Sequence, residues 1–252
     1  MPHDDKRRLE KTIEDLQTHF GPRSVGRMGE GSPGRADHLA TGFPSLDDVL
    51  RGGLSRGRIT EIGGAPTTGI VTLALKVVAQ AQAQGDTAVY LDLEQTFDPV
   101  YAARCGVALE RLLLVRPDDE QQACALLRDF AEGERSVLVC DLPSTTGNGS
   151  RLAQLLPETL GRLLAPLDRS SALLLCLVPQ PPGRTPPAPQ LPLRHYATLR
   201  LLLERERWLH QGQDVRGYQA QVHILKNKEQ PELTGISVEI DVTFDDVEGV
   251  DG

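Results

Sequence analysis

Two glycines with the spacing of a phosphate-binding loop are the first residues of this chain that suggest a chemistry. A working loop, GxxxxGK[ST], follows a strand and opens a helix: backbone N–H groups hold phosphates, the lysine neutralises their charge and the hydroxyl holds magnesium. Gly64 and Gly69 keep this spacing, but Ile70 stands where the lysine belongs and Val71 where the hydroxyl belongs. Thr72 lies about 100° further round the helix and substitutes poorly for the magnesium ligand. On spacing alone, a plain strand–helix turn is favoured over a weakened nucleotide site.

The missing lysine has an energetic consequence. Losing one charge-assisted hydrogen bond costs about 1.5–3 kcal/mol in binding. The cost is larger in a phosphoryl-transfer transition state, which depends almost entirely on electrostatic stabilisation. Lys76 is out of position for the phosphates, because it lies about 9 Å further along the helix axis. We therefore expect no ATP hydrolysis by the usual route, no required cofactor, and at most weak binding of ATP and Mg²⁺.

Strands and helices on either side must position this loop. Strands are expected at 58–62, 88–93, 112–115, 136–141 and 172–178, and helices at about 70–84, 99–105, 119–131 and 150–167. Apolar strands without alternation, each followed by a helix, indicate a parallel sheet covered on both faces. Three later strands, at 195–203, 218–226 and 235–244, indicate an antiparallel or mixed extension. The predicted class is therefore α/β, with a mostly parallel sheet flanked by helices.

The ends of the chain differ from its centre. We expect three segments: an N-terminal helix with a linker at 1–38, a core at 39–244 and an acidic tail at 245–252. Apolar residues recur at helical spacing in the first segment, at Leu9, Ile13, Leu16 and Phe20. A lone amphipathic helix cannot bury its apolar stripe by itself. It packs either on its own core or on another subunit, and spacing alone leaves both alternatives open.

Composition limits the location and the partners. A net charge of −8 over 252 residues argues against a surface coated with basic side chains for nucleic acid. The four cysteines form no CxxC pair, so we expect buried reduced thiols, no metal site and a reducing compartment. No apolar run approaches the roughly 18 residues that span a membrane. We therefore expect a soluble, cytoplasmic protein.

Several stretches, read in order, resemble one family. They are TGFPSLDDVLRGGLSRGRITEIGG before the loop, YLDLEQTFDPVYAARCGV and VLVCD after it, and later LRHYATLRLLL with the triplet Lys226-Asn227-Lys228. From about residue 5 to 244 the chain is similar to the RecA family of bacterial recombinases. The resemblance implies a RecA-like P-loop core whose loop is degenerate, with an N-terminal helix that packs on the neighbouring subunit.

Residue by residue, the resemblance implies a set of residues retained from the family's ATP-hydrolysing site. Glu94 matches the glutamate that activates the attacking water, and Asp141 matches the aspartate that ends the magnesium-associated strand. Lys226 and Lys228 match a pair that reaches the nucleotide of the adjacent subunit. A vestigial or weak nucleotide site would comprise Gly64, Thr67, Thr68, Gly69, Thr72, Asp98 and Tyr101. Of these, Asp98 and Tyr101 would contact adenine. The alternative for the acids and lysines is an inherited scaffold without present function.

The segments that match the DNA-binding loops depart from the family pattern. The first, at 142–150, is truncated, and the second, at 181–192, is rich in proline with a single Arg184. Gln180 matches the glutamine that reports the nucleotide state to the second loop. Neither loop offers an aromatic side chain on which a single strand could stack. Gln180 and Arg184 remain candidates for DNA contact, but we expect no strand exchange.

These features favour a degenerate RecA paralogue that acts through protein contacts. The nearest named type is ImuA, a RecA-like protein that accompanies the translesion polymerase partner ImuB in damage-induced (SOS) mutagenesis. The implied partners are a RecA filament, an ImuB-type protein, or further copies of this chain. Two alternatives stay open. One is a divergent recombinase that hydrolyses ATP with a lysine supplied from elsewhere, and the other is an accessory that binds single-stranded DNA without nucleotide.

Overall fold

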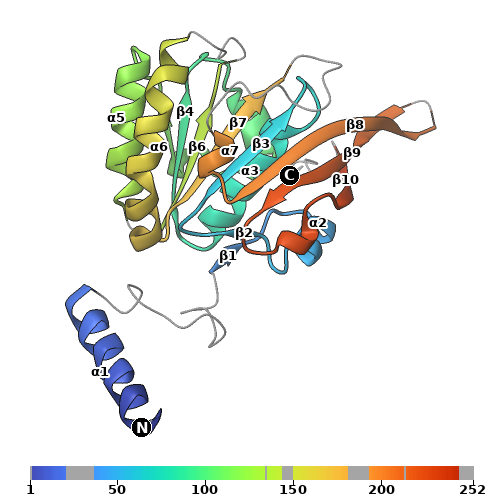
Figure 1. Ribbon diagram of the computed structural model, residues 1–252. Coiled ribbons are helices and arrows are strands. Elements are labelled where there is room, and N and C mark those ends of the chain that lie inside the picture. The colour runs from blue at the N-terminus through green and yellow to red at the C-terminus, as the bar shows by residue number, and fades with distance from the viewer. Residues whose placement is uncertain are drawn as a thin grey trace. The chain divides into compact units, whose positions relative to one another are not determined.

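An eight-stranded sheet extends from Ile59 to Thr243 of the computed structural model (Figure 1). Its strand order is β10-β9-β8-β3-β7-β6-β4-β5. The strands are β3 (Ile59–Gly64), β4 (Thr87–Asp92), β5 (Leu112–Val115), β6 (Ser136–Asp141), β7 (Leu173–Pro179), β8 (Leu199–Gln211), β9 (Asp214–Asn227) and β10 (Ser237–Thr243). From β8 to β5 every neighbouring pair is parallel, whereas β9 is antiparallel to both β8 and β10. The predicted α/β class, with a C-terminal antiparallel extension, is confirmed.

The structure describes residues 2–20, 37–133, 135–143, 150–180, 193–212 and 214–243. They belong to two compact units, 1–37 and 38–252. The first holds the predicted N-terminal helix, α1 (Pro2–Phe20). Most of the predicted linker, most of the first DNA-loop segment, all of the second with Arg184, the acidic tail and the Phe20 side chain lie outside the described residues. Of the described helices, none is long and apolar enough to cross a membrane.

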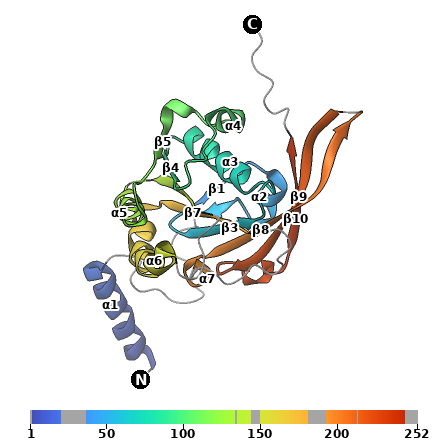
Figure 2. The ribbon, with the colours of Figure 1, turned by 90° about the horizontal axis from the view of Figure 1, so that it is seen from above.

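Helices cover both faces of the sheet, which explains the continuous apolar strands. One face packs against α3 (Ile70–Ala83) and α4 (Pro99–Arg104), the other against α5 (Glu120–Ala131) and α6 (Arg151–Ser170) (Figure 2). Within β7, Leu173, Leu175 and Leu177 join the first apolar cluster, whereas Leu174 and Cys176 join the second. The four cysteines are buried and free, as predicted.

The strand predicted at 195–203 needs correction. Residues 193–196 form a short helix, α7 (Leu193–Tyr196), and β8 begins only at Leu199. The amide of Thr198 donates to the carbonyl of Ile59 at 2.8 Å, so attachment to β3 starts there. β8 then continues to Gln211, because it pairs with β9 along its whole length. Elements not predicted are β1 (His38–Leu39), α2 (Pro44–Val49), β2 (Leu54–Ser55), η1 (Leu109–Arg111) and η2 (Pro231–Leu233).

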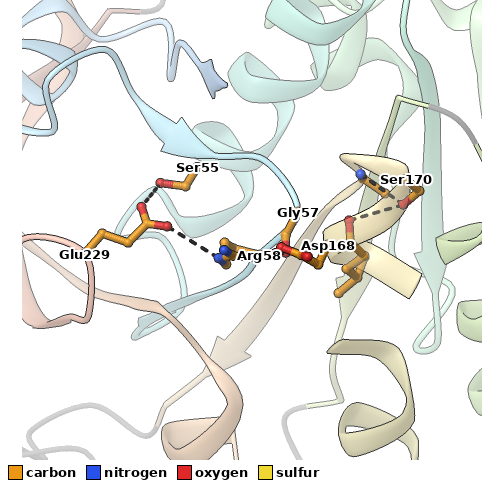
Figure 3. A network of polar contacts seen from close by, with 8 residues as sticks. Ser55, Gly57, Arg58, Asp168, Ser170 and Glu229 are labelled. Atoms are coloured by element: carbon orange, nitrogen blue, oxygen red, sulfur yellow. Dashed lines mark hydrogen bonds and ion pairs between the residues drawn. The ribbon is translucent and has the colours of Figure 1, made fainter. Parts of the chain in front are cut away.

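A polar network fixes the amino end of β3 (Figure 3). Arg58 donates to Asp168 of α6 at 2.6 Å, and its Nε lies 3.4 Å from a carboxylate oxygen of Glu229 in the turn after β9. Glu229 also accepts a hydrogen bond from Ser55 of β2. Each partly exposed pair contributes little to stability by itself. Together they join three segments that are far apart in the sequence.

One buried ion pair marks the pairing of β3 with β8. Glu61 and Arg200 are neighbours across the two strands, and Arg200 donates to both carboxylate oxygens at 2.7 Å. The Glu61 side chain is only 6% exposed. Because a buried carboxylate without its cation is costly, the pair favours this register over a shifted one.

Arg200→Met is therefore expected to lower the free energy of unfolding by about 3 kcal/mol, because Glu61 would remain buried without its cation. Replacing both residues with leucine should cost less than the single change. Urea denaturation measures both effects. Arg162→Met is the control, since Arg162 and its partner Glu158 are 61% and 65% exposed and their pair should contribute little. Equal losses in Arg200→Met and Arg162→Met would contradict this role of the buried pair.

Candidate functional site

The two glycines of the loop are required by its packing. β3 ends at Gly64 and α3 begins at Ile70, so the predicted strand–loop–helix order is confirmed. Gly69 has a φ of +104°, and a Cβ there would lie 2.8 Å from the Tyr218 hydroxyl. A Cβ on Gly64 would lie 2.8 Å from the carbonyl oxygen of Leu203. Side chains at either position would clash or strain the backbone.

The residues at the lysine and hydroxyl positions serve apolar packing. Ile70 is 5% exposed and belongs to the apolar cluster around α3. Its Cγ2 lies so close to Gly64 that a Cβ on the glycine would be 2.8 Å away. Val71 is half-buried against the same cluster. Neither residue can supply the charge or the hydroxyl that the full pattern uses.

The hydroxyls of the loop already have partners. Thr68 donates to the Ala65 carbonyl at 2.8 Å, which closes the loop on itself. Arg205 of β8 donates to the Thr67 hydroxyl at 3.1 Å, and its guanidinium carbon lies 4.4 Å from the centre of the Trp208 ring. Arg205 was not predicted as a site residue. It is 138 positions from Thr67 in the sequence, and no local pattern marks it.

Thr72 faces two tyrosines. Its hydroxyl lies 2.6 Å from the Tyr101 hydroxyl and 3.4 Å from that of Tyr218. Burial raises the pKa of Tyr101 to about 12, and the hydrogen bond with Thr72 opposes that rise. Both phenols therefore stay protonated at neutral pH, and the Thr72 hydroxyl is held toward α4.

A cavity of about 180 Å³ opens beside this hydroxyl pair. Thr72 and Lys76 of α3, Tyr101 and Arg104 of α4, and Asp241 of β10 are among the residues that line it.

Asp98, expected as an adenine contact, caps the helix that carries Tyr101. Its carboxylate accepts hydrogen bonds from the amides of Val100 at 2.9 Å and Tyr101 at 3.1 Å. An Asp side chain at the N-cap satisfies backbone donors that have no partner within the helix. Asp98 therefore positions Tyr101 at the cavity.

Acidic side chains gather where β4 and β6 end. Asp92 and Asp141 are neighbours across these strands. Asp92 accepts hydrogen bonds from the amides of Thr96 and Phe97, and its carboxylate lies 3.2 Å from Arg116. These contacts fix the turn that carries the exposed Glu94. Asp92 was not predicted as a site residue, although it ends an apolar strand.

Asp141 is held partly out of water. Tyr90 donates a hydrogen bond to its carboxylate at 2.7 Å. Burial raises the pKa of Asp141 to about 6, with further contributions from the charges of Asp92 and Glu94, while the Tyr90 hydrogen bond lowers it. Burial and Asp141 together raise the pKa of Tyr90. Glu94 and Asp141 therefore lie close enough at this edge of the sheet for their charges to interact.

Gln180 lies beside the loop, whereas the lysine pair does not. The backbone N–H of Gln180 donates to the Gly64 carbonyl at 2.8 Å. Lys226 of β9 lies opposite Arg200 in the strand register, near the start of β8 and toward the end of β3 that is away from the loop. Lys226 donates to the Arg194 carbonyl, and Lys228 donates to the His195 carbonyl at 3.0 Å. Both lysines therefore fasten α7. Burial lowers the pKa of Lys226, with the charges of Lys228 and Arg200 acting in the same direction.

The donor set does not fit magnesium and ATP in the usual way. The positions that would neutralise phosphate and ligate the metal hold Ile70 and Val71. Within the part of the chain that the structure describes, no three His, Cys, Asp or Glu residues are grouped to hold a metal ion.

Comparison with known families matches residues 7–142, more than half of the chain, to the RecA N-terminal domain. The chain belongs to the RecA family. Protein RecA of Listeria ivanovii and Protein RecA of Listeria seeligeri are each 30% identical to it over 259 residues, covering 94% of this chain and 74% of the relative.

The raised pKa of Asp141 predicts a pH effect on stability. Since the folded-state pKa of about 6 exceeds the ordinary value of 3.8, the protonated carboxyl stabilises the folded protein fully below about pH 4. This stabilisation is lost as the pH rises through 6. Asp141→Asn stays neutral and can still accept from Tyr90. We expect the difference in unfolding free energy between Asp141→Asn and the wild type to shift in favour of the variant by about 2–3 kcal/mol between pH 4 and pH 8.

Urea denaturation at several pH values measures this gain. The exposed Asp129→Asn is the control, because it should change little relative to the wild type across the same range. A constant difference between Asp141→Asn and the wild type would count against the burial of a charged Asp141.

Proposed function

We propose that this RecA-family protein has lost ATP hydrolysis and acts in bacterial DNA repair through protein contacts. The observation that carries the proposal is Ile70, buried at the position of the phosphate-binding lysine. Phosphoryl transfer depends on fixed positive charge around the transferring group. Together with Val71 at the metal-ligand position, this leaves Glu94 and Asp141 without the charge that would make their chemistry productive.

The proposed role is ImuA-like, in SOS-induced translesion mutagenesis in the cytoplasm. The partners would be a RecA filament, an ImuB-type polymerase partner, or further copies of this chain. The N-terminal helix supports this proposal, because its apolar stripe needs a surface on which to pack. Lys226 and Lys228 support it less directly, since both ammonium groups are engaged with α7.

A second candidate is a working recombinase with a cation supplied from elsewhere. Arg205 favours it, because its guanidinium reaches the Thr67 hydroxyl at 3.1 Å. Against it, Arg205 is stacked on Trp208 and offers no replacement for the metal ligand at position 71. A third candidate, a single-strand DNA-binding accessory, is disfavoured by the loop composition and the net charge of −8.

Phosphate release with Mg-ATP and single-stranded DNA separates the first two candidates. We expect the wild type to release no more phosphate than Glu94→Gln, because the transition-state charge is not neutralised. Ile70→Lys with Val71→Thr should bind Mg-ATP about tenfold or more tightly than the wild type. Wild-type turnover that is lost in both Glu94→Gln and Arg205→Ala would establish the second candidate instead.

Cosedimentation with RecA filaments on single-stranded DNA tests the protein-contact role. We expect the full chain to sediment with the filament and Ile13→Asp to lose most of this association, because a charge would interrupt the apolar stripe. Glu10→Gln on the same helix is the control and should retain it. Equal sedimentation of all three proteins, or no sedimentation of the wild type, would contradict the proposed contact between the helix and the filament.

A further inference from the structure

Three side chains form a hydrogen-bonded chain across β10, β9 and β8, which are neighbours in the sheet (Figure 1). Ser237 of β10 lies opposite His223 of β9 in the strand register, and its hydroxyl is 2.7 Å from Nδ1 of the His223 ring. On the other side of the ring, Nε2 lies 3.3 Å from a carboxylate oxygen of Glu204 on β8. A serine, a histidine and a carboxylate connected in this order are the groups that activate a serine nucleophile.

The alternation of side chains along each strand brings these three residues to one face of the sheet. Side chains of the opposite parity pack with α3 in one apolar cluster, among them Leu203, Val222 and Val238. Glu204, His223 and Ser237 therefore face away from α3. Ser237 is exposed, and the His223 side chain is 31% exposed. A small molecule can thus reach the serine hydroxyl from solvent.

The carboxylate of Glu204 determines which ring nitrogen of His223 carries the proton. A carboxylate only accepts hydrogen bonds, so Nε2 holds the hydrogen and donates it to Glu204. Nδ1 then keeps a lone pair that faces the Ser237 hydroxyl and can take its proton. The contact with Glu204 also orients the ring and stabilises the imidazolium that forms when the proton is transferred.

Gln221 offers a donor for the negative charge that develops on a reacting carbonyl oxygen. It precedes His223 by two residues on β9, so its side chain lies on the same face. Gln221 and Ser237 are diagonal neighbours across the two strands, a separation that long side chains span. Among the described residues, the buried side-chain oxygen of Gln221 has no hydrogen-bond partner. Because a half-turn of the amide exchanges its oxygen and nitrogen, the same position can present N–H groups.

We propose that Ser237 is a nucleophile that takes the acyl group of small carboxylic esters, with His223 as its general base and Glu204 as the group that orients the base. The serine oxygen bonds to the carbonyl carbon as its proton passes to Nδ1. His223 returns this proton to the leaving alkoxide as the ester C–O bond breaks. A water molecule, deprotonated at the same nitrogen, then releases the carboxylic acid and restores Ser237. This chemistry is independent of the loop from Gly64 to Gly69 and of ATP hydrolysis.

Release of p-nitrophenol from p-nitrophenyl acetate by the full chain tests the proposal. We expect Ser237→Ala and His223→Gln each to lower the rate above buffer about tenfold or more, because a positioned general base contributes about 100-fold and surface amines leave a residual rate. Ser45→Ala and His210→Gln are the matched controls and should retain the wild-type rate. Ser45 is an exposed serine that donates to the Glu239 carbonyl instead of a histidine, and His210 is an exposed histidine near the end of β8.

No release above buffer by the wild type, an unchanged rate in Ser237→Ala, or an equal loss in His210→Gln overturns the proposal. If Ser237→Ala does not fold, treatment of the wild type with a fluorophosphonate decides the outcome. The serine oxygen then displaces fluoride from phosphorus as its proton passes to His223, and peptide mass spectrometry locates the adduct. An adduct on Ser237 supports the proposal, whereas an adduct elsewhere, or none, overturns it.

Discussion

Parallel pairing of β3 with both β7 and β8 is the constraint on which the site depends. The carboxyl ends of parallel strands meet at one edge of a sheet, so residues that end different strands converge there. β3 leads into the loop, and β7 brings Gln180 to the Gly64 carbonyl. β8 carries Arg205 to Thr67. The buried Glu61–Arg200 pair opposes a shift of β8 along β3 that would separate Arg205 from the loop.

The packing around the loop explains how its glycines can persist without the lysine. Gly64 is crowded by the Leu203 carbonyl and by Ile70, and Gly69 combines a positive φ with the nearby Tyr218 hydroxyl. These constraints come from the protein itself and act whether or not a phosphate is bound. Position 70 has no such constraint, since an isoleucine there joins the apolar cluster. Glycine spacing alone is therefore weak evidence for nucleotide chemistry, whereas the residues after the second glycine are informative.

Local signals predicted most of the fold. Apolar runs predicted the strands, and the Asp98-Pro99 pair predicted the start of α4, because helix caps and buried strands depend on residues that are neighbours in the sequence. The strand predicted at 195–203 was wrong at its start, since a four-residue helix leaves no periodic signature. Arg205 and Tyr218 reach the site from late strands, and the register of β8 with β9 shifts between Arg205 and Arg207. Such contacts depend on tertiary pairing, which one sequence does not reveal.

The position of β3 in the strand order also bears on how the chain is made. β4, β5 and β6 lie within residues 87–141 and can pair with one another early in synthesis. β3 precedes them in the chain, yet its two partners are β7 and β8, which begin at residues 173 and 199. Pairing over such separations is slow compared with local contacts. An emerging chain therefore holds β3 and the loop without strand partners until the ribosome has translated most of the protein, so a strand that is buried along its whole length in the folded protein stays exposed during that interval.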